Sequence, residues 1–222
     1  MPAPTKTPSI DAKKPLKTGR KPAQARAKAR VERILDAAVS LIAEKGSEAM
    51  RMSEVASHAG VPIGSLYQYF PDKAALLLEL AQIYNKRIRA QIGAMLETIQ
   101  SQEDIVPILS DLLDGYYQMF LEEPVARDIW CGTQAHKSLE WCDIEDSRLN
   151  GALVFESLKQ FYPKSTWPDL KTRSFLVMQL TGAAVRLAIA LEPEEGRLVM
   201  KSYAGLLSRE FLSNPENTYA LK

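Results

Sequence analysis

Helical periodicity constrains this chain most, because its apolar residues recur at the spacing of an α-helix and no segment alternates like a β-strand. Gly, Pro or paired acidic residues separate each apolar segment from the next, and these residue types commonly end helices. The pattern therefore predicts an all-α chain of about nine helices. We expect them at residues 31–42, 53–58, 63–70, 73–96, 104–121, 124–138, 144–161, 169–191 and 193–212.

The charged residues divide the chain near residue 90. Residues 1–90 carry 16 Lys and Arg against 8 Asp and Glu, a net charge of +8. Residues 91–222 carry 12 against 19, a net charge of −7. Such an asymmetry indicates that the N-terminal part binds a polyanion, unless the surface charges are scattered by chance.

Composition excludes a membrane span and a secreted disulfide scaffold. The longest run without a charged residue, residues 55–71, contains Gly, Pro and polar residues, so it does not resemble a span of about 20 apolar residues. The first 33 residues hold no apolar stretch of the kind that a signal peptide requires, and the chain has 2 cysteines. We expect a soluble cytoplasmic protein.

Residues 53–70 form the most specific pattern, two short helices joined by a tight turn. Ala56 lets the helices cross closely, and Gly60 suits the positive φ that the turn requires. Val61, Leu66 and Phe70 are then expected to be buried. The outward face at the start of the second helix carries Ile63, Gly64, Ser65, Tyr67 and Gln68.

The segment Gly60-Val61-Pro62-Ile63-Gly64-Ser65-Leu66-Tyr67-Gln68-Tyr69-Phe70-Pro71-Asp72-Lys73 resembles the signature of the tetracycline-repressor (TetR) family of bacterial transcriptional regulators. The match extends over residues 28–80. The resemblance implies a dimer whose N-terminal helix-turn-helix binds palindromic operator DNA, with dimerisation through the last two long helices. It divides the chain into a basic, Pro-rich disordered arm (1–24), a DNA-binding domain (25–72), a connecting helix (73–96) and a ligand-binding and dimerisation domain (97–222).

The resemblance assigns phosphate contacts to Tyr67, Tyr69 and Lys73. The alternative for the two tyrosines is an ordinary core or surface role. Gln68 can bond bidentately to adenine, and Gly64 and Ser65 allow close approach to the groove. Ile63 suits a thymine methyl group, and Arg51 suits a charged phosphate contact. The basic residues Arg26, Lys28 and Arg30 either follow a groove of the DNA or form a solubilising tail.

The C-terminal half is rich in aromatic residues and Met. Most of these side chains serve core packing, but a helical domain that senses a small molecule needs a cavity lined by some of them. The predicted effector is small and largely apolar. Its candidate contacts are Tyr116, Phe120, Trp130, Phe155, Met178 and Gln179.

Small residues in the last two predicted helices allow two helices to approach closely. They favour either a dimer interface, in agreement with the TetR resemblance, or tight packing within one subunit. The candidate interface residues are Gly182, Ala183, Ala204, Gly205 and Ser208.

Cys131, His136 and Cys142 lack the paired spacing of a zinc site, so no metal or cofactor is expected. The chain also has no Gly-rich phosphate loop and no nucleophile elbow, so we expect no enzyme activity. The sequence predicts a ligand-responsive repressor. The alternative is a non-specific or architectural DNA-binding protein without an effector.

Overall fold

The computed structural model describes residues 20–135 and 139–212, and every regular element within these ranges is helical. Nine α-helices follow one another in the described part of the chain, which confirms the predicted all-α class. They are α1 (Arg20–Ala49), α2 (Met52–His58), α3 (Ile63–Tyr69), α4 (Lys73–Leu96), α5 (Ile105–Glu122), α6 (Pro124–Ala135), α7 (Glu140–Leu158), α8 (Trp167–Ala190) and α9 (Pro193–Leu212), with 3-10 turns at Gln102–Asp104, Lys159–Phe161 and Lys164–Thr166.

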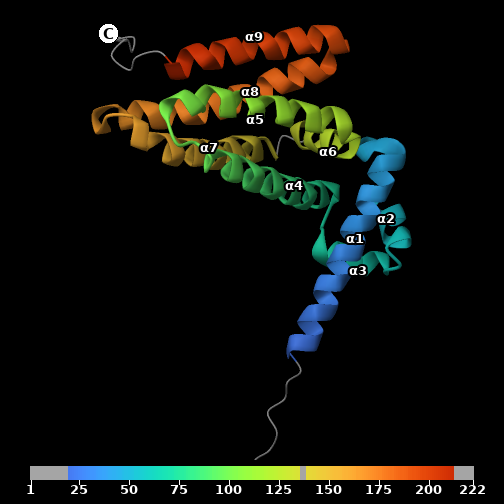
Figure 1. Ribbon diagram of the computed structural model, residues 1–222. Coiled ribbons are helices and arrows are strands. Elements are labelled where there is room, and N and C mark those ends of the chain that lie inside the picture. Colours follow the sequence, from blue (N-terminus) through green and yellow to red (C-terminus); the bar gives the residue numbers. More distant parts are fainter. Residues whose placement is uncertain (1–19, 136–138, 213–222) are drawn as a thin grey trace, which may run out of the picture.

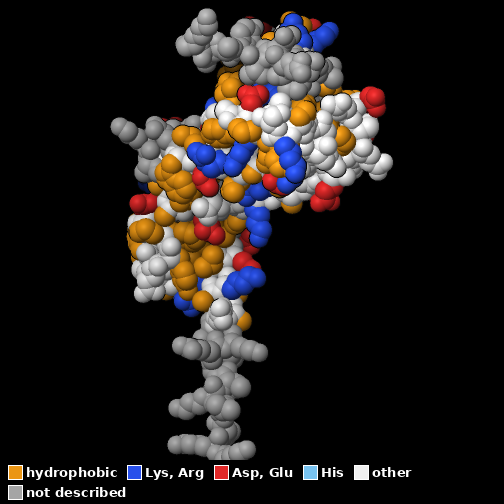
Figure 2. All heavy atoms as spheres, turned by 90° about the vertical axis from the view of Figure 1, so that its left-hand side faces the viewer, with side chains coloured by type: hydrophobic (Ala, Val, Ile, Leu, Met, Phe, Trp, Pro, Cys, Tyr) orange, Lys and Arg blue, Asp and Glu red, His pale blue; other side chains and the backbone are white. Residues whose placement is uncertain are grey.

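The helices form a small group and a larger bundle. In Figure 1, α1, α2 and α3 lie together at one end, and α4 leads from them into the bundle of α5 to α9. The N-terminal turns of α1 project beyond the group, away from the bundle. Figure 2 shows apolar side chains at the surface of the lower part of the molecule, with Lys and Arg side chains beside them.

Apolar side chains are buried in two clusters, and α4 belongs to both. The first cluster contains residues of α1, α2, α3 and α4 together with Ile129 of α6. The second cluster fills the bundle. Leu76 and Leu80 of α4 lie in the first cluster, and Ile88 and Leu96 lie in the second. One continuous helix therefore connects the two packed regions.

Three residues determine where the N-terminal helices break, turn or begin, and the turn at Gly60 was predicted from the sequence. Gly46 has φ 82° and interrupts α1 before its last turn, and Gly60 has φ 63° in the turn between α2 and α3. Asp72 caps α4 because its carboxylate accepts a hydrogen bond from the Ala75 N–H at 2.7 Å.

Helix α1 begins earlier than the sequence indicated. Disorder was expected through residue 24, but the helix starts at Arg20. Pro22 falls in the first turn, where a missing N–H costs nothing, and alanine at every second position from 23 to 29 favours helix. The remainder of the predicted arm, residues 1–19, lies outside the described residues.

Within the described residues, one helical segment, Lys164–Ala190, is long and apolar enough to cross a membrane by length and composition alone. Its most apolar window has a mean hydropathy of 1.2, and 33% of that window is buried. The segment contains α8, which packs against both α7 and α9. A helix that packs between two neighbours in a bundle also needs apolar residues on several sides. This packing therefore explains the apolar character of α8 without a membrane.

Replacing Gly60 with Ala should lower the free energy of unfolding by about 1–2 kcal/mol, because a side chain disfavours the left-handed backbone conformation. A Cβ atom at this position would meet nothing within 4 Å, so the cost lies in the backbone. Gly93→Ala is the matched control. Gly93 is helical with equally open surroundings, so Ala there should stabilise by about 0.5–1 kcal/mol. Urea unfolding measures the change in the free energy of unfolding for both variants. A change of the same sign in both would contradict the left-handed conformation assigned to Gly60.

Candidate functional site

Helices α2 and α3 form the predicted helix-turn-helix. Val61, Leu66 and Phe70 are buried with Val55 in the first cluster, as the sequence predicts. The opposite side of α3 is exposed. Its exposed residues are Ile63 (42%), Tyr67 (48%), Gly64 and Gln68.

The N-terminal half of α1 lies beside this exposed side. The Arg30 guanidinium donates a hydrogen bond to Ser65 Oγ of α3 at 3.2 Å. Arg26 and Lys28 are exposed, and Lys28 Nζ lies 3.7 Å from the Glu32 carboxylate. The basic residues of α1 and the exposed face of α3 are thus joined by a direct contact.

Lys73 has a role that the sequence did not indicate. Its ammonium group donates hydrogen bonds to the carbonyl oxygens of Ser47, Glu48 and Met50 at 3.0, 2.8 and 3.5 Å. These carbonyls lie at the end of α1, where the helix itself provides no donors. All three ammonium donors are therefore engaged within the chain. In this structure Lys73 joins α4 to α1, an arrangement that competes with the predicted phosphate contact.

The remaining predicted DNA contacts differ in exposure. Arg51 is exposed and directly precedes α2. Its backbone N–H donates to the Glu54 carboxylate at 3.0 Å, and Lys45 pairs with the same carboxylate at 2.6 Å. Hydrogen bonds from Lys45 and from the Arg51 backbone hold the pKa of Glu54 below its usual value. Tyr69 is half-buried and packs against the first cluster.

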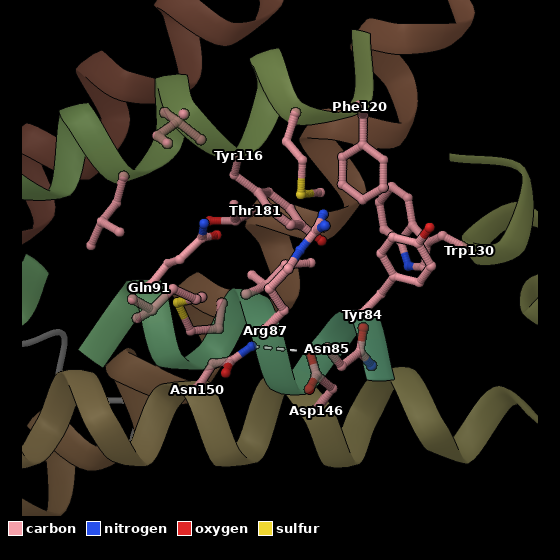
Figure 3. A pocket seen from close by; sticks show the side chains of 18 of the residues that line it. Tyr84, Asn85, Arg87, Gln91, Tyr116, Phe120, Trp130, Asp146, Asn150 and Thr181 are labelled. Atoms are coloured by element: carbon pink, nitrogen blue, oxygen red, sulfur yellow. Dashed lines mark hydrogen bonds between the residues drawn. The ribbon is translucent and has the colours of Figure 1, made fainter. Parts of the chain in front are cut away.

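A cavity of about 680 Å³ lies within the bundle, between α4, α5, α6, α7 and α8 (Figure 3). Its volume is typical of small-molecule sites, and much of its wall is apolar. Four of the six predicted ligand contacts line it, namely Tyr116, Phe120, Trp130 and Met178.

Aromatic rings form one side of the cavity. The rings of Phe120 and Trp130 stack with centroids 4.5 Å apart, and Tyr116 meets Phe120 edge-on at 4.9 Å. The guanidinium carbon of Arg186 lies 5.0 Å from the Trp130 centroid. These contacts hold the indole of Trp130 in one orientation beside the open space.

Two carboxylates of α7 border the cavity. Asp143 accepts hydrogen bonds from Trp130 Nε1 at 3.4 Å and Gln179 Nε2 at 3.1 Å, and it pairs with Arg186 at 3.4 Å. Its charge is therefore balanced from the side of α8.

Asp146 forms the second set of polar contacts. Its carboxylate pairs with Arg89 of α4 and accepts a hydrogen bond from Asn150 Nδ2 at 3.0 Å. Arg89 Nε also donates to Asn150 Oδ1 at 3.1 Å. Burial nevertheless raises the pKa of Asp146 above its usual value, because these two partners offset only part of the cost of desolvation.

Two predicted ligand contacts lie elsewhere. Phe155 does not line the cavity; its ring meets that of Trp167 edge-on at 6.1 Å, because its side of α7 faces the start of α8. Gln179 lies behind Asp143 and binds that carboxylate.

Sequence reasoning missed the wall provided by α4, which includes Tyr84, Asn85, Arg87 and Gln91. The helical spacing of Tyr84, Ile88, Gln91 and Met95 places these residues on one face of α4, a signal that becomes useful once α4 is assigned to the wall.

The predicted interface residues also divide. Gly182 is buried and lines the cavity, so the subunit itself covers this residue. Ala183 and Gly205 are exposed, and Ala204 and Ser208 are half-buried.

The two cysteines are free thiols, with Cys131 exposed and Cys142 half-buried. His136 lies outside the described residues. Within the described ranges, no group of three His, Cys, Asp or Glu residues is arranged to hold a metal ion.

Family models match both halves of the chain. The model described as bacterial regulatory proteins, tetR family, matches residues 34–80, and that of the tetracyclin repressor-like C-terminal domain matches residues 103–214. The chain belongs to the TetR family of bacterial transcriptional regulators. Its α2 and α3 are accordingly the helix-turn-helix through which such regulators bind DNA.

Individual relatives agree with this family assignment. An uncharacterized HTH-type transcriptional regulator of Mycobacterium tuberculosis (strain ATCC 25618 / H37Rv), Rv0196, is 29% identical over 147 residues, covering 65% of this chain and 69% of the relative. A TetR-family regulator from Streptomyces coelicolor has a similar fold, with a TM-score of 0.59 and 24% identity over 84% of this chain and 97% of that one. RolR in complex with resorcinol has a TM-score of 0.60 and 18% identity over 87% and 97%.

Lys73→Met tests the assigned structural role of Lys73 in this TetR-family protein. Loss of the charged hydrogen bonds should lower the free energy of unfolding by about 1–3 kcal/mol in urea. Lys28→Met is the control, and its exposed side chain should change stability by less than about 0.5 kcal/mol. The salt dependence of DNA binding should be unchanged in Lys73→Met. A shallower log–log slope would show that Lys73 neutralises a phosphate after all.

Proposed function

We propose that this TetR-family protein is a ligand-responsive repressor that acts as a homodimer in the bacterial cytoplasm. Its two α3 helices bind the half-sites of a palindromic operator, and a small, largely apolar effector in the cavity weakens that binding. One observation carries the proposal: Ile129 of α6 lines the cavity and also belongs to the apolar cluster of the DNA-binding helices. A ligand in the cavity therefore lies directly against Ile129, which also packs among the DNA-binding helices.

The exposed side of α3 supports sequence-specific binding. Gln68 offers an amide that bonds bidentately to adenine, and Ile63 offers an apolar surface for a thymine methyl group. Tyr67 has a hydroxyl suited to a phosphate oxygen. Arg26 and Lys28 on the projecting part of α1 add positive charge for the backbone, which contributes affinity without sequence information.

The homodimer is expected to form through α8 and α9. Both helices carry exposed leucines that the subunit itself leaves uncovered, in an arrangement that marks interaction surfaces. With the exposed Ala183 and Gly205 beside them, two copies of this face can form a four-helix interface. The leucines are Leu176 (50%), Leu180 (47%) and Leu187 (53%) on α8, and Leu198 (60%) and Leu206 (57%) on α9.

Helix α6 supplies the connection between effector and DNA. On one side, the Asp128 carboxylate accepts a hydrogen bond from the Ser47 N–H at 2.5 Å, next to the interruption of α1 at Gly46. On the other side, Ala126 and Trp130 line the cavity. An effector that favours a different position of α6 thereby disfavours the arrangement of α1 required by the operator.

The nature of the cavity supports a small-molecule effector. Its aromatic wall suits a molecule with a ring, and RolR, a neighbour of the same fold, is known in complex with its ligand resorcinol. We extend only the expectation of a small ligand to this chain.

Selection of bound DNA from a random pool should recover a pseudo-palindrome with half-sites about one helical turn or somewhat more apart. Sedimentation should give a dimer. Gln68→Ala should change the preferred base, whereas Tyr67→Phe should weaken binding to all sequences equally. Affinity that is independent of sequence, or a selected site without a dyad, would instead favour an architectural DNA-binding protein.

Asp128→Ala should uncouple the two sites, because it removes the acceptor that joins α6 to α1. Effector affinity is expected to change little, since Asp128 does not line the cavity. The fold-reduction of operator affinity by effector should drop towards one. Asp128→Asn keeps an acceptor oxygen and should retain most of the response. Full coupling in the Ala variant would exclude this contact from the signal.

A further inference from the structure

Charges around the cavity are distributed unevenly. Among the described residues that line it, one is basic and five are acidic: Arg87, and Asp111, Glu122, Glu123, Asp143 and Asp146. A wall with this excess of carboxylates favours a cationic ligand over an anionic one.

Arg87, the one basic residue among the described residues of this wall, is already engaged. The Arg87 guanidinium donates to both carboxylate oxygens of Glu123, at 2.9 and 2.6 Å, and its central carbon lies 5.0 Å from the Tyr84 ring centroid. Arg87 is therefore not free to receive an anionic ligand.

The other nearby guanidinium groups stand behind carboxylates. Arg89 and Arg186 bind Asp146 and Asp143, but neither arginine lines the cavity. The carboxylates are thus closer than their counter-charges to a bound molecule. Asp111 and Glu122 are exposed, and they form no ion pair among the described residues.

Polar groups without protein partners complete the wall. Ser147 is 8% exposed and lines the cavity, and neither its hydroxyl nor that of Tyr116 has a hydrogen bond within the described chain. In Figure 3, Tyr116 of α5 and Gln91 of α4 lie on opposite sides of the same space, and Asp146 of α7 lies beside Asn150 next to α4. Asp146 also lines the cavity. Burial, together with Asp146 and Asp143, raises the pKa of Tyr116, so its hydroxyl stays protonated.

We propose that the effector cavity binds an organic monocation, an ammonium group carried on an aryl or alkyl body. The ammonium lies beside Asp146, Tyr116 and Ser147, where carboxylate and hydroxyl oxygens replace its water. The apolar body packs on the Phe120 side, where aromatic faces also attract cations. This inference rests on the proposed function, whose effector it describes more closely.

Three probes that share one body test the charge preference: 4-phenylbutylammonium, 4-phenylbutanol and 4-phenylbutyrate. Calorimetry at low ionic strength should rank the ammonium tightest and the carboxylate weakest, with about tenfold or more between these two. Added salt should weaken ammonium binding and leave alcohol binding unchanged. Equal or tighter binding of the carboxylate would overturn the proposal, as would failure of all three probes to bind.

A double variant at the rim, Asp111→Asn with Glu122→Gln, should weaken binding of the ammonium several-fold and leave binding of the alcohol unchanged. Asp114→Asn is the matched control, since Asp114 is exposed on the same helix but does not line the cavity. An equal loss for the alcohol, or an equal effect of Asp114→Asn, would refute the electrostatic preference.

Operator binding separates this inference from the function on which it rests. Should the alcohol or the carboxylate bind best and release operator DNA, the repressor proposal stands and the cation proposal falls. Should the ammonium bind best without affecting operator affinity, the cation site stands and ligand-responsive repression falls.

Discussion

Helix α4 is packed into both apolar clusters, and this shared membership constrains the rest of the molecule. Because close-packed side chains resist gaps and overlaps, α4 cannot move against one cluster without disturbing the other. Polar contacts hold it along its length. Lys73 binds the end of α1, Arg87 binds Glu123 at the end of α5, and Arg89 binds Asp146 of α7.

Helix α6 is a second helix that contacts both the first apolar cluster and the cavity of the bundle. Its Ile129 lines the cavity and also belongs to the first apolar cluster. Its Asp128 carboxylate accepts a hydrogen bond from the backbone N–H of Ser47. With α4 on one side and α6 on the other, the cavity is bordered by both helices that support the helix-turn-helix. In the proposed mechanism, a ligand needs only a modest difference in affinity between two arrangements, about 1–3 kcal/mol, to change DNA occupancy several-fold or more.

Local chemistry explains which features could be predicted from the sequence. The positive φ of Gly60, the cap at Asp72 and the buried side of α3 at Leu66 depend on residues within one or two turns. Lys73 could not be assigned in this way, because its carbonyl partners lie 23 to 26 residues earlier in the chain. Gly182 was expected at the dimer interface but is buried within the subunit, because a small residue allows close helix packing without indicating which neighbour is close.

The residues around the cavity could be predicted from the sequence only in part. Aromatic content indicated Tyr116, Phe120 and Trp130, which do line it. The pairing of Asp146 with Arg89 spans 57 residues, and no spacing rule within one helix predicts it. The charge of the wall, and with it the proposed charge of the effector, follows only from the packing of several helices around one space.

The most direct test is the distance between the two DNA-binding domains of the proposed dimer. Spin labels at exposed Ser57 of α2, in a variant with both native cysteines replaced by Ser, report that distance by pulsed electron resonance. The proposed coupling predicts one narrow distance with operator DNA and a different mean distance with a molecule that calorimetry shows to bind the cavity. Identical distance distributions in the two states would contradict it.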